Sequence, residues 1–471
     1  MTTTINLKRI LDRKQWEMIN PAPVASAAGS VIVPSSLSDQ LSLYWQAATV
    51  VYLYDPAEDA FVQLPSPALS GTFGLGSAGE HHPSGPTGTA SAGSASTITT
   101  TVTTVQQLPG YTIRITGGTG AGQERVISSN TIGTNAVFTV TSPWTTTPDA
   151  TSTYLLLTGR FYLFMGGAGG SSMKYWDVAT GAWSAALTVS GAPSAGTTEI
   201  QMVATSNGGT NPIASGTSTG TNSTTTLNNT GKAWTTNQWT NFQVRITSGT
   251  GAGQVRVISS NTATALTVSV VWTTTPDATS VYVIEGNDNN IYLLGNAAVT
   301  LYLYSISGNT WSTITPGVAR AAAPSTGVTA EWVFRSVNIN FNTENSVVNG
   351  KRIYSFRGGA VGTLDYYDIA ANTWASGITY QNSGETFTTG TSITQGNDGI
   401  MYIQKDATGR WFKYDAALNA LQPWSLLMYP QGAAIAGNKA WTVTFTDGAS
   451  VIKWVYWLNN TQTFMFRQIV I

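Results

Sequence analysis

The side chains that most often carry catalysis are scarce in this chain of 471 residues. It contains no cysteine, which excludes disulfides, thiolate metal sites and cysteine nucleophiles together. Its two histidines, His81 and His82, are neighbours in a stretch rich in Gly, Pro and Ser. Because adjacent histidines in a loop rarely converge on one ion, the sequence predicts neither a metal site nor a cofactor.

A glycine-rich hexapeptide, GTGAGQ, occurs at 118–123 and again at 249–254. A phosphate-binding loop needs a helix directly after its glycines and usually a Lys-Ser/Thr pair. Here alternating apolar residues, which are typical of a β-strand, follow both copies. We therefore expect a glycine turn between two strands and no nucleotide site.

Paired carboxylates could still support glycoside hydrolysis, since that reaction needs only two acids across a cleft. Four aspartates share one repeated turn position, where a carboxylate accepts hydrogen bonds from turn amides: Asp55, Asp177, Asp368 and Asp415. The other candidates show no spacing that marks a pair: Glu285, Asp288, Glu331, Glu344, Glu385 and Asp398. The sequence therefore predicts a protein without enzymatic activity.

Charged residues make up only 10% of the chain, against about 25% in ordinary soluble proteins. The net charge of −1 offers no broad basic surface, so we expect no sequence-specific binding of nucleic acid. No apolar run is long enough for a membrane span or a secretory signal. A charge-poor surface rich in Thr, Ser and Gly, on a chain made in a cytosol, suggests a protein that is assembled there and later exposed outside the cell.

Beyond Leu41, short runs of Val, Ile, Tyr, Thr, Phe and Trp alternate with Gly, Asn and Asp turns, which predicts an all-β protein. One short unit recurs: a Tyr-rich strand, a turn, and an aromatic residue six positions after an Asp-like position. Its clearest copies, KYWDVATGAW and DYYDIAANTW, each follow a strand that ends in two glycines. We expect the aromatic residue to be buried against the next sheet.

This unit resembles the kelch repeat, whose blades carry a di-glycine, then Tyr-Asp, then a Trp six residues on. The resemblance implies a kelch-like β-propeller of about six blades and says little about function. It marks these positions as structural: Gly166, Gly167, Asp177, Trp183, Trp311, Gly358, Gly359, Asp368 and Trp374.

A longer unit recurs almost unchanged, as YTIRITGGTGAGQERVISSNT at 111–131 and FQVRITSGTGAGQVRVISSNT at 242–262. We interpret the two as copies of one small β-module, each inserted between propeller blades, because loops tolerate insertion. Their arginines alternate with Ile and Val, so they should point away from the module's core. They would then pair with Asp149 and Asp277 or contact a partner. The GTGAGQ-x-R-x-I pattern resembles a module of bacteriophage virion proteins.

The first residues differ from the rest because they carry helical periodicity. Asn6 could cap a short helix that continues to Met18, and this helix either docks on its own domain or grips a neighbouring subunit. The residues expected to contact a partner are Leu7, Ile10, Leu11 and Trp16. The expected order is an arm and linker (1–40), a first blade (41–70), module 1 (71–157), a blade (158–190), module 2 (191–286) and the remaining blades (287–471).

These patterns favour a non-enzymatic structural protein of a phage virion, such as a tail hub, nozzle or neck component that forms an oligomeric ring. Its partners would be further copies of itself and other virion proteins. The alternative is a receptor-binding or decoration protein that contacts host-surface glycans, and a polysaccharide depolymerase ranks third. Copy number separates the first two, since rings and fibres have different symmetries.

Overall fold

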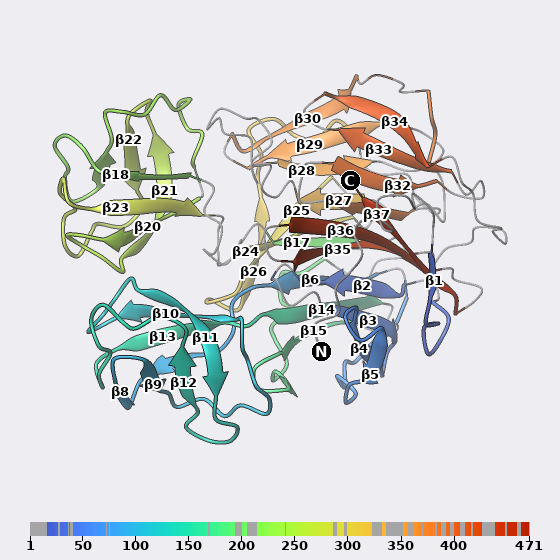
Figure 1. Ribbon diagram of the computed structural model, residues 1–471. Coiled ribbons are helices and arrows are strands. Elements are labelled where there is room, and N and C mark those ends of the chain that lie inside the picture. Colours follow the sequence, from blue (N-terminus) through green and yellow to red (C-terminus); the bar gives the residue numbers. More distant parts are fainter. Residues whose placement is uncertain are drawn as a thin grey trace.

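A computed structural model shows the fold of the chain (Figure 1). It describes these residues: 17–26, 29–35, 37, 41–71, 73–74, 76–167, 170–193, 200–204, 214–240, 242–285, 290–295, 299–322, 332–335, 352–356, 362–369, 371–379, 381, 384–387, 392–395, 400–405, 410–415, 418–425, 439–447, 450–458 and 463–470. Within these ranges all regular structure is β-strand, arranged in antiparallel sheets. The all-β prediction is confirmed.

Six of the sheets have four strands each, and we number them along the chain. Sheet 1 contains β2 (Val31–Pro34), β3 (Ser42–Ala47), β4 (Val50–Asp55) and β5 (Ala60–Gln63). Sheet 2 contains β6 (Ser77–His82), β14 (Arg160–Gly167), β15 (Gly170–Asp177) and β16 (Ala182–Trp183). Sheet 3 contains β17 (Ile200–Ala204), β24 (Asn290–Gly295), β25 (Leu301–Ser305) and β26 (Thr310–Ile314).

The last three sheets come from the C-terminal part of the chain. Sheet 4 contains β27 (Trp332–Arg335), β28 (Arg352–Phe356), β29 (Leu364–Asp368) and β30 (Thr373–Ile378). Sheet 5 contains β31 (Ser392–Gln395), β32 (Ile400–Gln404), β33 (Trp411–Asp415) and β34 (Ala420–Ser425). Sheet 6 contains β35 (Lys439–Asp447), β36 (Ser450–Leu458), β37 (Met465–Val470) and, at its edge, β1 (Glu17–Ile19).

One edge strand of each sheet, the first strand in sheets 1 to 5 and β35 in sheet 6, contacts the corresponding strand of the next sheet. β2 contacts β6, β6 contacts β17, and β17 contacts β27. β27 then contacts β31, β31 contacts β35, and β35 returns to β2. The six sheets are therefore joined through one edge strand each, and these contacts form a closed cycle.

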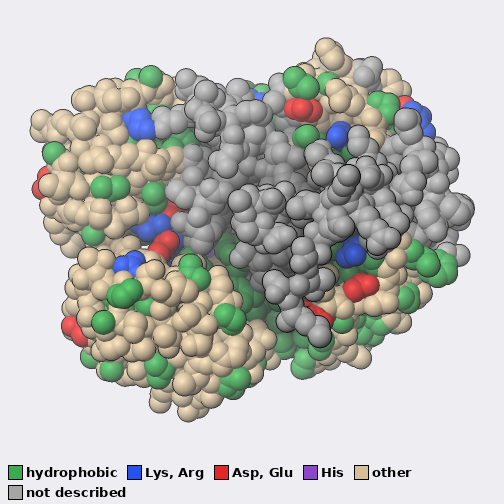
Figure 2. All heavy atoms as spheres, in the orientation of Figure 1, with side chains coloured by type: hydrophobic (Ala, Val, Ile, Leu, Met, Phe, Trp, Pro, Cys, Tyr) green, Lys and Arg blue, Asp and Glu red, His purple; other side chains and the backbone are tan. Residues whose placement is uncertain are grey.

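Two further sheets form the inserted modules. Module 1 (83–159) contains β7 (Thr87–Thr89), β8 (Ala92–Gly93), β9 (Thr97–Thr99), β10 (Thr112–Gly117), β11 (Glu124–Asn130), β12 (Val137–Val140) and β13 (Thr153–Leu157). Module 2 (205–289) contains β18 (Ala214–Thr217), β19 (Thr226–Asn228), β20 (Gln243–Ser248), β21 (Val255–Asn261), β22 (Ala265–Val268) and β23 (Val281–Glu285). Both lie on the same side of the six sheets, next to each other (Figures 1 and 2).

The position of the modules differs from the prediction that each lies between two blades. Module 1 separates β6 from β14, which pair within sheet 2, and module 2 separates β17 from β24 within sheet 3. Each sheet thus begins one strand earlier than the repeat pattern indicates. Residues 77–82 and 200–204 belong to sheets 2 and 3, although the predicted module boundaries of 71–157 and 191–286 include them.

The N-terminal prediction also needs correction. Met18, placed at the end of a helix from the sequence, lies in β1, whose residues pair with Met465–Arg467 of β37. Val31–Pro34, assigned to an extended linker, is the first strand of sheet 1. At Met18, backbone hydrogen bonding to a neighbouring strand thus takes the place of the expected helical turn. The proposed contact residues Leu7, Ile10, Leu11 and Trp16 lie outside the described residues.

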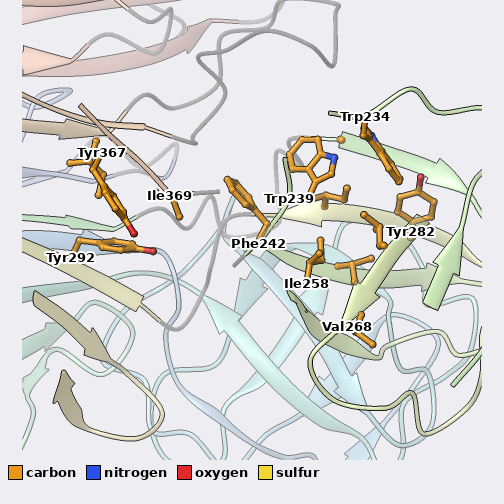
Figure 3. Packing of buried hydrophobic residues seen from close by; sticks show 14 of the residues in the cluster. Trp234, Trp239, Phe242, Ile258, Val268, Tyr282, Tyr292, Tyr367 and Ile369 are labelled. Carbon is orange, nitrogen blue, oxygen red and sulfur yellow. The ribbon is translucent and has the colours of Figure 1, made fainter. Parts of the chain in front are cut away.

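Each module buries its own aliphatic and aromatic side chains. The core of module 1 includes Ile113, Phe138 and Tyr154, and among the described residues only Ala179, in a turn of sheet 2, joins it from outside. The core of module 2 is continuous with that of sheets 3 and 4. Figure 3 shows Phe242 between the module's interior and Ile369 of sheet 4, so this side chain anchors module 2 to the sheets.

Candidate interaction surface

The GTGAGQ segments form the same turn in both modules, and a glutamine closes it. In module 1 the Gln123 side-chain amide donates to the carbonyls of Gly120 and Thr146, at 3.0 and 2.8 Å. Its amide oxygen accepts from the backbone N–H of Thr145 at 2.7 Å. Gln254 repeats these bonds in module 2. The turn is thus fixed to the WTTTP segment, and the expectation of a glycine turn between two strands is met.

The second arginine of each copy also fixes the WTTTP segment. Arg125 donates to the Pro143 carbonyl at 3.0 Å and lies over the Trp144 ring, 5.5 Å from its centre. Arg256 makes the equivalent contacts with Val271 and Trp272. These arginines hold the module together by hydrogen bonding and a cation–π contact.

Neither aspartate of the repeat pairs with an arginine in the described contacts, which corrects the expected Asp149 and Asp277 pairs. The Asp149 carboxylate accepts from the backbone and side chain of Thr151, at 2.8 and 2.6 Å. These hydrogen bonds, the side-chain bond first, hold the pKa of Asp149 below its ordinary value. Asp277 and Thr279 repeat the arrangement.

The two GTGAGQ turns meet each other. Gly122 and Gly253 occupy the same position in the two copies, are buried, and both have a φ of +88°. A Cβ on Gly122 would lie 2.9 Å from the Gly253 nitrogen, and one on Gly253 would lie 2.6 Å from the Ala121 Cβ. Glycine is therefore needed here twice over, for the left-handed backbone and for the close approach of the second module.

The first arginines of the repeat meet at the same place. Arg114 and Arg245 are each 3% exposed and share two carboxylates. Arg245 lies 2.6 Å from Glu285 and 3.0 Å from Glu124. Arg114 pairs with Glu124 and lies 3.6 Å from Glu285. Figure 2 shows side chains of both signs gathered where the two modules meet, on a face with few other charges.

This cluster is balanced in charge although its carboxylates are not repeated in the sequence. Glu124 has Val255 as its counterpart in module 2, and Glu285 has Leu157 in module 1. Each module thus supplies one guanidinium and one carboxylate, from equivalent arginines but different acidic positions. Because a buried charge is costly unless it is paired, this balance is what permits the close packing of the two arginines.

The predicted structural residues of the short repeat lie at turns and sheet edges. The Asp177 carboxylate accepts from the backbone N–H groups of Ala179 and Thr180 and from Arg160. Asp368 accepts from the backbone of Ala371 at 3.0 Å. Gly166 and Gly167 end β14, and Gly358 and Gly359 lie outside the described residues.

The repeated tryptophans differ in burial. Trp374 and Trp311 are buried, at 4% and 8% exposure, whereas Trp183 is half-buried. The Trp183 indole N–H donates to the Pro65 carbonyl of the preceding sheet at 2.7 Å. That of Trp311 donates likewise to Thr188, at 3.0 Å. In sheets 2 and 3 the repeated tryptophan therefore ties its sheet to the segment that leaves the sheet before it. The buried indole N–H of Trp374 in sheet 4 has no hydrogen-bond partner among the described residues.

The same turns contain a second repeated contact, which was not predicted from the sequence. A tyrosine hydroxyl donates, at 2.8–2.9 Å, to an Asn or Asp five residues later that has a positive φ. The four pairs are Tyr54–Asp59, Tyr304–Asn309, Tyr367–Asn372 and Tyr414–Asn419. Burial raises the pKa of the Tyr304 hydroxyl to about 12, so this group remains a donor at neutral pH.

The same Asn or Asp reaches the neighbouring sheet. Asn372 donates to the Thr315 carbonyl at 3.1 Å, and Asn419 donates to that of Thr379 at 2.7 Å. Asn309 accepts from Thr188, and Asp59 accepts from the backbone of Asn20, directly after β1. The Tyr-x4-Asn/Asp spacing is the sequence signal that could have identified these residues.

The histidines are part of a sheet and not of a loop. Both lie in β6 and are completely buried. The His81 ring lies edge-on to Phe161, and His82 shares a hydrogen bond of 2.6 Å with Ser84. Throughout the described ranges, no three His, Asp or Glu side chains come together as a metal site. No helix that could cross a membrane occurs in those ranges.

Comparison with known proteins adds no assignment. No protein-family model matches the chain, and no curated protein matches its sequence. Of the acidic residues without an expected structural role, Glu285 belongs to the arginine cluster, and Glu385 pairs with Lys405 and Arg410 at 2.7 and 3.0 Å. Asp288, Glu331, Glu344 and Asp398 lie outside the described residues.

Proposed function

We propose that the six four-stranded sheets are the blades of a kelch-like β-propeller. Support comes from the closed series of contacts among the edge strands β2, β6, β17, β27, β31 and β35, and from β1, an N-terminal strand that completes the C-terminal sheet. Bonds between neighbouring sheets support it further. A side chain of one sheet bonds to the sheet before it in five places. The side chains are Asp59 (sheets 6 and 1), Trp183 (sheets 1 and 2), Asn309 (sheets 2 and 3), Asn372 (sheets 3 and 4) and Asn419 (sheets 4 and 5).

On this fold, we propose that the protein is a non-enzymatic structural component of a phage virion, which acts as one subunit of a tail hub, nozzle or neck ring. The observation that carries the proposal is the use of its charged groups. Asp177, Asp368, Glu285 and Glu385 all hold the fold or join the modules. The paired modules are thereby fixed on one side of the propeller, as a scaffold that contacts other subunits requires.

The resemblance of the GTGAGQ module to modules of phage virion proteins supports the assignment to a virion. A propeller pairs its strands within each blade and leaves only short edges, so its loops are free to carry contacts with other proteins. Both modules are inserted in such connections. Each lies between the first and second strands of its own blade, and the two blades are neighbours. We place the contacts with other virion proteins on the modules.

Two truncations test the subunit-gripping role proposed for the N-terminal segment. Deletion of residues 1–16 retains β1, whereas deletion of residues 1–20 removes it together with Asn20. We expect the shorter deletion to keep the thermal stability of the full chain and to lose incorporation into virions. The longer deletion should also lower the melting temperature, because sheet 6 loses its edge strand.

Normal incorporation of the shorter deletion would contradict the role of the arm. Cleavage of host polysaccharide by the purified full chain would contradict the non-enzymatic assignment. A trimeric fibre in place of a ring would favour the receptor-binding alternative.

A further inference from the structure

The contact between the two modules brings equivalent residues together. Gly122 faces its counterpart Gly253, and Arg114 lies in one ion cluster with its counterpart Arg245. A contact in which the same patch is used on both sides is the arrangement found in twofold-symmetric homodimers. Here it occurs within one chain, between two copies of a duplicated sequence.

We propose that the face formed by the GTGAGQ turn and the first arginine of the repeat is a homotypic pairing surface. Its partner is a second copy of the same module, which the chain itself supplies. When that copy is removed, the module of a second chain takes its place. This inference concerns the module alone and does not depend on the virion assignment.

The charges satisfy the requirement that such a face be self-complementary. Module 1 contributes Arg114 and Glu124, and module 2 contributes Arg245 and Glu285. Any two of these faces, alike or different, combine two guanidinium groups with two carboxylates. A pair of module 2 faces is therefore as balanced in charge as the pair seen here.

The shape of the face also favours a copy of itself. Gly122 and Gly253 allow the two backbones to approach, and Ala121 adds only a methyl group beside them. A larger side chain at Ala121 would enter the space occupied by the turn of module 2. In a pair of module 2 faces, its counterpart Ala252 would take the same place. Neither alanine has a positive φ, so a larger residue there does not strain its own turn.

The connections of the modules to sheets 2 and 3 explain why the modules pair within one chain and not between chains. Both modules are tethered at both ends, and a short tether gives a partner an effective concentration in the millimolar range. The ends of module 1 lie together, since His82 and Arg160 are opposite each other in β6 and β14. A two-residue turn can therefore replace residues 83–159 without moving either strand.

The first experiment uses the full chain and measures the distance between the modules. The absence of native cysteine allows spin labels at Ile132→Cys and Val270→Cys, two exposed positions, one in each module. We expect one narrow distance by electron–electron double resonance. Ala121→Arg should broaden and lengthen the distribution, whereas the exposed control Ala150→Arg should leave it unchanged. A distribution unaffected by Ala121→Arg would overturn the proposal.

The second experiment tests pairing between chains. In a variant with Asn-Gly in place of residues 83–159, module 2 has no partner in its own chain. We expect sedimentation to show added dimerisation as the chain approaches millimolar concentration, and Ala252→Arg in the same variant should abolish it. A variant that sediments as the full chain does, or a dimer that survives Ala252→Arg, would contradict the proposal. If the variant does not fold by circular dichroism, the spin-label measurement decides.

Discussion

The modules and the four-stranded sheets, the two kinds of repeat in this chain, differ in how much of their sequence recurs from copy to copy. The modules keep almost the same residues over their repeated segments. The glutamines, second arginines and aspartates of the repeat also keep equivalent partners, as Gln123 and Gln254 do. The six sheets keep little beyond a Tyr, an Asn or Asp, and an aromatic residue around one turn. The modules meet each other through equivalent faces, so each face must fit the other. Neighbouring sheets are joined by hydrogen bonds from a side chain to a backbone carbonyl. Because every residue has a backbone carbonyl, the accepting position tolerates many residue types.

The largest loss of stability is expected from replacing a buried tryptophan of the sheets. Trp374→Ala should lower the free energy of unfolding by about 3–5 kcal/mol, because a large buried ring leaves a cavity. Trp183→Ala should cost only about 1–2 kcal/mol, because this ring is half-buried. Chemical denaturation of both variants measures the difference. Equal losses would mean that the repeated aromatic position has one role in all sheets.

A smaller effect is expected at the turn that joins neighbouring sheets. Asn372→Ala removes the bonds to Tyr367 and Thr315 at a residue with a φ of 52°. We expect a loss of about 1–2 kcal/mol. Asn372→Gly relieves the backbone strain but not the lost bonds, so it should lie between Ala and the native residue. If Gly matches the native residue, the turn needs Asn for its backbone alone.

The smallest effect concerns the exposed aspartates of the modules. Hydrogen bonds from Thr151 and Thr119 lower the pKa of Asp149, and bonds from Thr279 and Thr250 lower that of Asp277. The pKa of each aspartate is lower in the folded chain than in the unfolded chain, where it is about 4. The two carboxylates therefore stabilise the fold fully above about pH 4, and this contribution is lost as the pH falls further. Asp149→Asn with Asp277→Asn should flatten the acid limb of thermal stability. An unchanged limb would contradict this.

Much of the fold follows from local patterns, and the errors have a physical cause. Strand periodicity and turn residues correctly predict an all-β chain, and the near-identical segments form matching antiparallel strand pairs, β10–β11 and β20–β21. In sheets 1 to 3 the first strand was missed because β2, β6 and β17 carry no repeated residue. In sheets 2 and 3 an entire module also separates this strand from the rest of its sheet.

The interaction surface could be predicted only in part. GTGAGQ and the repeated arginines mark it, since they recur in both copies. The carboxylates do not, because Glu124 and Glu285 stand at different positions of the repeat and resemble any other acidic residue. Their pairing becomes visible only when the two modules lie side by side. The Tyr-x4-Asn/Asp turns, in contrast, were present in the sequence as a fixed spacing.

Cryo-electron microscopy of phage particles, with antibody against the modules, tests the central proposal most directly. A propeller subunit of a hub, nozzle or neck should appear as a closed ring around the tail axis, with sixfold or twelvefold symmetry and the module pairs in equivalent positions. Absence of the label from particles, or label confined to trimeric fibres, would contradict the account.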